Sequence, residues 1–101
     1  MVIPSVGTVV LVRFPFSDLS RSKPRPAVVL ADTERNDWVL CQVTSQDYTD
    51  PLAAEIKNGD LASGSFRKDS YARPGKLFTA NAGIMTKQIG ELKSEKLAEI
   101  I

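Results

Sequence analysis

The stretch that decides the fold reads Lys23-Pro24-Arg25-Pro26-Ala27-Val28-Val29-Leu30. Its second half is a short apolar run rich in β-branched residues, which is typical of a strand buried on both faces. Pro26 cannot donate a hydrogen bond to a sheet, so it fits at or just before the start of that strand. Because a proline follows it, Arg25 is biased towards an extended backbone. The stretch therefore predicts a strand from Arg25 to about Ala31, with a charged side chain placed where a loop enters the strand.

Further strand-like segments lie on both sides of this stretch. Thr8–Phe14 and Trp38–Val43 are rich in β-branched and aromatic residues, and both predict strands. Ala53–Ile56 predicts a short edge strand and Gln88–Leu92 a further strand, whereas Leu61–Lys68 looks irregular. About five to seven short strands in so short a chain favour a small barrel or rolled sheet, because closure removes exposed strand edges.

Turn signals and one helical pattern complete the expected fold. Turns are predicted at Asp32–Asp37, at Lys57–Asp60 with its Asn-Gly pair, and at Arg73–Gly75. Ser94 is a suitable N-cap for a last helix, whose apolar residues Leu97, Ile100 and Ile101 are spaced to share one face. We predict a mostly β fold, a β-barrel with a minor helical part, in a single domain over residues 1–101.

Composition narrows the class of protein. Of 101 residues, 43% are hydrophobic and 25% charged, which is ordinary for a globular protein. No apolar run is long enough to span a membrane, and residues 1–5 lack the basic and apolar regions of a signal peptide, so we expect a cytoplasmic protein. The absence of histidine and the single cysteine, Cys41, argue against a zinc site and against Ser-His or Cys-His catalysis. We expect Cys41 to be a buried strand residue, and we expect no metal or other cofactor.

Charge is unevenly distributed along the chain. The net charge is only +1, which by itself does not indicate a nucleic-acid binder. Residues 31–60, however, hold seven acidic and two basic side chains, while residues 1–30 and 61–101 are each basic on balance. This pattern is compatible with a basic face and an acidic face.

Four segments together carry a family resemblance. They are Gly7-x-Val9-Val10-x-Val12-x-Phe14, Lys23-x-Arg25-Pro26-Ala27-Val28-Val29-Leu30, Val43-Thr44-Ser45-Gln46 and Ser70-Tyr71-Ala72-Arg73-Pro74-x-Lys76-Leu77-Phe78-Thr79. In this order and spacing they resemble the MazF/PemK-like toxins of bacterial type II toxin–antitoxin systems, over nearly the whole chain. The resemblance implies an SH3-like barrel with a C-terminal helix, a homodimer, and metal-independent, sequence-selective cleavage of single-stranded RNA that a cognate antitoxin protein blocks.

The resemblance also implies site residues. The family's catalytic arginine precedes the proline of its "RPA" motif, which is Arg25 here, and its catalytic threonine or serine ends the third strand, which is Thr44 here. The RNA-binding residues expected around this pair are Lys23, Arg21, Ser45, Gln46 and Lys76. Additional phosphate contacts are expected from Arg13 and Arg73, and base stacking from Phe16 or Tyr48.

Such a pair suits the chemistry of RNA cleavage without a metal. The ribose 2′-hydroxyl attacks the adjacent phosphate, leaving a cyclic phosphate and a free 5′-hydroxyl. A guanidinium matches two phosphate oxygens at once, and a threonine hydroxyl can donate to another. Arginine stays protonated in proteins, so Arg25 is expected to stabilise charge, and the general base is left unassigned.

Two other functions are compatible with the sequence. CcdB-like toxins share the barrel but act by binding DNA gyrase, and the pair of Arg25 and Thr44 favours the ribonuclease over that class. The third possibility is an inactive member that only binds RNA or antitoxin. Many family members carry a Gly-Ser-Glu-Gln run before the arginine, whereas this chain has Ser20-Arg21-Ser22-Lys23 without a carboxylate.

Overall fold

The computed structural model describes residues 4–13, 24–44, 53–64 and 70–100, with the backbone alone at 13, 24, 75 and 76. These parts of the chain form seven strands, two 3-10 turns and one helix. The elements are β1 (Thr8–Arg13), β2 (Pro24–Glu34), β3 (Asp37–Thr44), β4 (Ala54–Ile56), η2 (Asn58–Asp60), β5 (Leu61–Gly64), β6 (Ser70–Asn81), η3 (Ala82–Ile84), β7 (Met85–Leu92) and α1 (Ser94–Ile100).

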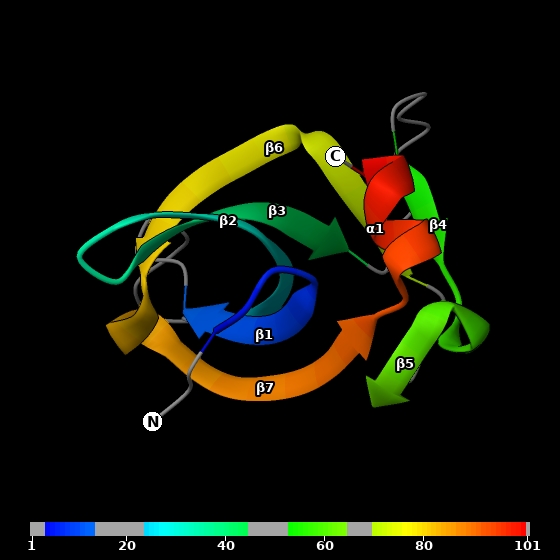
Figure 1. Ribbon diagram of the computed structural model, residues 1–101, viewed down its shortest axis with the longest axis horizontal. Helices are drawn as coiled ribbons and strands as arrows, with labels where there is room; N and C mark the ends of the chain where they lie inside the picture. Colours follow the sequence, from blue (N-terminus) through cyan, green and yellow to red (C-terminus); the bar gives the residue numbers. More distant parts are fainter. Residues whose placement is uncertain (1–3, 14–23, 45–52, 65–69, 101) are drawn as a thin grey trace.

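All strand pairs are antiparallel, and the seven strands form one sheet in the order β4-β6-β3-β2-β1-β7-β5. The sheet curls so far that its edge strands, β4 and β5, come to the same side of the molecule, next to α1 (Figure 1). The prediction of a small, mostly β barrel with a C-terminal helix is confirmed.

The central strands β1, β2 and β3 are buried on both faces, as the apolar run in β2 predicts. Their alternate side chains enter two core clusters. The first core cluster consists of Val9, Val28, Cys41, Val43, Ile56, Leu61, Ala72, Leu92 and Ile100. The second core cluster consists of Val10, Val12, Ala27, Val29, Leu40, Ala80, Ala82 and Met85. The strand that holds Arg25 is therefore fixed by packing on both of its sides.

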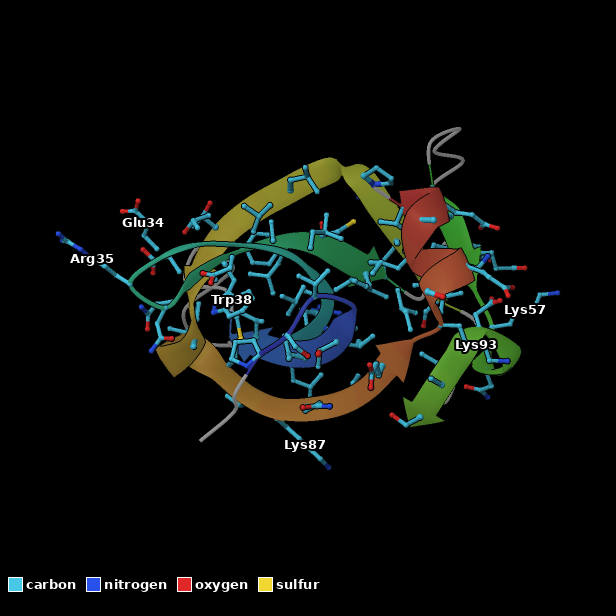
Figure 2. The ribbon with its side chains drawn as sticks, in the orientation of Figure 1. Glu34, Arg35, Trp38, Lys57, Lys87 and Lys93 are labelled. Atoms are coloured by element: carbon cyan, nitrogen blue, oxygen red, sulfur yellow. The ribbon has the colours of Figure 1, made fainter. Side chains whose placement is uncertain are left out.

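The hairpin between β2 and β3 is longer than the sequence indicated. The ladder continues to the pair Glu34 and Asp37, so the predicted six-residue turn shrinks to Arg35 and Asn36. Both residues have positive φ, 52° and 66°, which is the geometry of a two-residue turn that matches strand twist. Glu34 and Arg35 point away from the barrel at the tip of this hairpin (Figure 2).

Two other predictions were wrong in detail. Leu61–Gly64, expected to be irregular, is strand β5, because Gly64 packs directly against Gly90 of β7 and lets the two backbones approach. Arg73–Gly75 is not a turn between strands. β6 runs through it, and the register against β3 jumps from Leu77 to Arg73 between Cys41 and Gln42, so Pro74–Lys76 form a bulge.

The C-terminal helix is tied to the barrel by packing and by charge. Ile100 is buried in the first core cluster, and Leu97 packs against the same cluster. Lys96 Nζ lies 2.8 Å from Glu99 Oε2 and 3.6 Å from Asp60 Oδ2 of η2. The hydrogen bond to Glu99, with smaller contributions from the charge of Asp60, raises the pKa of Lys96.

Candidate functional site

Polar side chains gather where β2 begins and β3 ends. The antiparallel register pairs Ala27 of β2 with Gln42 of β3. Continuing that register by two residues places Arg25 opposite Thr44. Directly opposed residues share a face of the sheet, with Cβ atoms about 5 Å apart. The register of β2 and β3 thus predicts that Arg25 and Thr44, the two residues that the family resemblance assigns to catalysis, lie side by side.

The line of opposed residues that begins with Arg25 and Thr44 continues across the sheet. Thr44 pairs with Tyr71 of β6, and Tyr71 pairs with Glu55 of β4. Four strands thus contribute one residue each to a row that we call the first polar row: Arg25, Thr44, Tyr71 and Glu55. The end of β3, the start of β6 and β4 lie side by side near α1 in Figure 1.

A second, shorter row lies beside the first. Gln42 precedes Thr44 by two residues and therefore lies on the same face, and it pairs with Arg73. We call Gln42 and Arg73 the second polar row. On β2 the equivalent position is Ala27, which belongs to the second core cluster. The polar rows are thus the solvent-side continuation of a packed apolar face.

The bulge in β6 fixes the position of Arg73. The backbone of Arg73 hydrogen-bonds to the sulfur of Cys41, which lies on the opposite face of β3 from Gln42. Burial raises the pKa of the Cys41 thiol to about 11, and the hydrogen bond from Arg73 only partly offsets this effect. Cys41 is therefore a neutral core residue, as predicted, and it supports the strand that presents the second polar row.

The rows carry both signs of charge at different degrees of exposure. Arg25 is exposed, whereas Thr44, Gln42, Tyr71 and Arg73 are half-buried. Glu55 Oε1 lies 3.5 Å from Nζ of Lys57, the residue that follows β4, and the side chains of Glu55 and Lys57 are 41% and 65% exposed. An exposed pair of this kind contributes little to stability. Its importance is that it places a carboxylate and an ammonium at the end of the first polar row.

Several predicted site residues cannot be placed. Arg21, Lys23, Ser45 and Gln46 lie outside the described residues, as do Phe16, Tyr48 and the loop that lacks the family glutamate. For Lys76, the backbone is part of the β6 bulge, but its side chain is outside the description, as is that of Arg13. Of the predicted site residues, the structure thus locates the side chains of Arg25, Thr44 and Arg73.

Sequence analysis missed the contribution of three residues, Gln42, Tyr71 and Glu55. A signal was present for the first, because Gln42 and Thr44 alternate with the apolar Cys41 and Val43 at the end of a strand. The other two are brought in by strand pairings between distant segments, which no local pattern specifies.

Within residues 4–13, 24–44, 53–64 and 70–100, no three His, Cys, Asp or Glu side chains are grouped so that they could hold a metal ion. The helix in this part of the chain is too short and too polar to cross a membrane.

The family of the chain follows from its sequence as a whole. A model of the family described as PemK-like, MazF-like toxin of type II toxin–antitoxin system matches residues 5–101. The chain therefore belongs to this family, and the resemblance seen in its four motifs is confirmed. No curated protein matches the sequence.

Several solved structures have a fold similar to that of this chain. The MazE–MazF complex (Form II) from Deinococcus radiodurans has a TM-score of 0.76 and 21% identity, covering 99% of this chain and 90% of that one. An endoribonuclease in complex with its cognate antitoxin from a mycobacterial species has a TM-score of 0.72 and 15% identity, covering 97% and 87%. The Mycobacterium tuberculosis toxin MazF-mt6 has a TM-score of 0.71 and 12% identity, covering 92% and 87%. At these identities the likeness establishes the shared fold.

Proposed function

We propose that this toxin is a metal-independent endoribonuclease that cleaves single-stranded RNA at selected sequences and so inhibits translation and growth. The single observation that carries the proposal is the register of β2 and β3, whose last pair, Ala27 with Gln42, sets Arg25 opposite Thr44 when it is continued by two residues. Membership of the MazF-like family supports this function over gyrase binding of the CcdB type.

Each member of the pair has a distinct role. Arg25 is exposed and belongs to a strand held on both faces, so its guanidinium is free to engage two phosphate oxygens without losing its orientation. The hydroxyl of Thr44, on the neighbouring strand, donates to a third oxygen. As the 2′-oxygen attacks, the phosphate gains negative charge, and donors placed in advance stabilise that charge. The products are a cyclic phosphate and a 5′-hydroxyl.

The partners proposed are RNA, a second copy of the chain and a cognate antitoxin. Lys23, Arg21 and Lys76 bind the phosphates of the RNA backbone. Ser45 and Gln46, which follow Thr44 in the sequence, also contact the RNA. Two similar folds were solved with antitoxins bound, which supports an antitoxin here that covers the basic site. A toxin of this kind acts in the cytoplasm as a homodimer, with a mass in solution of twice 11.0 kDa.

The test uses purified protein, a long single-stranded RNA and EDTA. Wild type is expected to cut the RNA at a recurring short sequence, and Arg25→Ala is expected to lose the activity. Lys87→Ala is the matched control, because Lys87 is an exposed cation on β7 that points away from the barrel (Figure 2). Absence of cleavage by wild type would contradict the proposal and leave a toxin that acts by binding alone.

A further inference from the structure

The proposed reaction needs a group that removes the proton from the 2′-hydroxyl. The chain contains no histidine. An arginine side chain stays protonated in proteins, and a phenol keeps its proton at neutral pH because tyrosine titrates near ~10. Among the described residues of the two polar rows, Glu55 is the one side chain that is a proton acceptor at neutral pH.

We propose that Glu55 is the general base of the ribonuclease site. This inference rests on the proposed function and adds to it the residue that accepts the 2′-proton. The assignment comes from register alone: Glu55 of β4 pairs with Tyr71, which pairs with Thr44. The three side chains therefore share one face of the sheet.

The spacing suits a nucleotide. Neighbouring strands lie about 4.8 Å apart, so the Cα of Glu55 lies about 10 Å from that of Thr44, two strands away. Both side chains lie on the same face of the sheet, with Tyr71 between them in the row. A phosphate held by Arg25 and Thr44, with its ribose directed towards β4, places the 2′-hydroxyl between them. A general base acts at a heavy-atom distance of about 3 Å, which the flexible glutamate side chain can reach from an edge strand.

The exposure of its ion pair leaves the carboxylate of Glu55 available to a ligand. Lys57, 3.5 Å away, directly follows the last residue of β4, and Figure 2 shows it directed outward from the barrel. Because both side chains are substantially exposed, the pair does not lock the glutamate in place, and the carboxylate can turn towards a bound ribose.

The step balances without a co-reactant. The carboxylate of Glu55 takes the proton of the 2′-hydroxyl, the 2′-oxygen forms a bond to phosphorus, and the bond from phosphorus to the 5′-oxygen breaks. The leaving 5′-oxygen takes a proton from water, and Glu55 returns its proton to solvent. Arg25 and Thr44 stabilise the charge on the phosphate throughout.

The test separates chemistry from binding. Glu55→Gln keeps the size of the side chain and is expected to lower kcat for RNA cleavage by about 10²- to 10⁴-fold. The affinity for a 2′-O-methyl RNA, which cannot react, is expected to stay equal or to rise, because a negative charge near the phosphates is removed. Glu91→Gln is the matched control, since Glu91 is an exposed glutamate on β7.

Each outcome supports or overturns the inference. A lower kcat with unchanged or tighter binding, together with partial activity in Glu55→Asp, supports it. Glu55→Gln that cuts like wild type overturns it, and so does a loss of kcat matched by equal losses of RNA affinity and of thermal stability.

Tyr71→Phe is expected to retain activity, and a loss as large as that of Glu55→Gln would assign the proton to the phenol instead. If Arg25→Ala is inactive while Glu55→Gln is normal, the proposed function stands and only this inference fails. Inactive wild type contradicts both.

Discussion

At the scale of single residues, Thr44 tests whether a hydroxyl on β3 is part of the site. Thr44→Val keeps the β-branched shape that suits a strand but removes the donor. We expect kcat to fall by about 10²- to 10³-fold, the usual effect of losing one preorganised donor. Thr44→Ser retains the hydroxyl and is expected to remain within about tenfold of wild type. Equal cleavage by the valine and serine variants would remove Thr44 from the mechanism.

Cys41 gives a second residue-scale prediction, on stability. Its pKa is raised by burial to about 11, against an ordinary value of 9.0, so the folded state holds the thiol proton more tightly than the unfolded state does. The stabilisation is complete below pH 9 and is lost as pH rises towards 11. We therefore compare the unfolding free energy of wild type with that of Cys41→Ala. The difference between the two proteins is expected to change by about 2 kcal/mol, against wild type, as the pH rises from 9 to 11. Urea denaturation of both proteins at several pH values measures this, and a constant difference would contradict it.

The sequence led to the prediction of Arg25 and Thr44 as site residues but not to the proposal of Glu55, and the reason is physical. The first two adjoin apolar runs whose burial is evident from composition, so their place at strand ends follows from local pattern. Glu55 belongs to a three-residue edge strand, and its row depends on two pairings with β6. Strand pairing between distant segments is decided by packing of the whole sheet.

At the scale of elements, strand β5 depends on glycine. Gly64 has φ of +81°, and a Cβ there would meet the backbone of Ile89 and lie 2.6 Å from Gly90 Cα. We expect Gly64→Ala to separate β5 from β7 and to lower the unfolding free energy by about 1–3 kcal/mol. Gly59→Ala in η2 is the control, because a Cβ at Gly59 has no atom within 4 Å. Similar thermal unfolding of the two variants would show that the close approach is not needed.

The same pairing explains why β5 could not be foreseen. Its sequence, Leu-Ala-Ser-Gly, is short, consists mostly of small residues and contains no β-branched residue, so its local strand propensity is weak. The bulge at Pro74–Lys76 was mistaken for a turn because Pro-Gly is a turn signal in most contexts. Here the segments on both sides of the bulge pair with β3, and only the three inserted residues have no pairing partner in that strand. In contrast, β1, β2 and β3 were predicted correctly because their apolar runs leave few alternatives.

At the scale of the whole molecule, the net charge of +1 limits the ways in which the proposed RNA substrate could be bound. With little overall attraction, binding depends on a few local phosphate contacts and is expected to weaken steeply with salt. For single-stranded RNA, each contact contributes about −0.7 to the slope of log K against log salt. Arg25→Ala is therefore expected to make this slope shallower by about 0.7, measured with a 2′-O-methyl RNA over a range of KCl concentrations. Lys87→Ala, which removes the same charge from β7, is expected to leave the slope unchanged. If both variants changed the slope equally, RNA would be attracted by the overall charge of the molecule. The face that carries Arg25 would then not be a specific phosphate-binding surface.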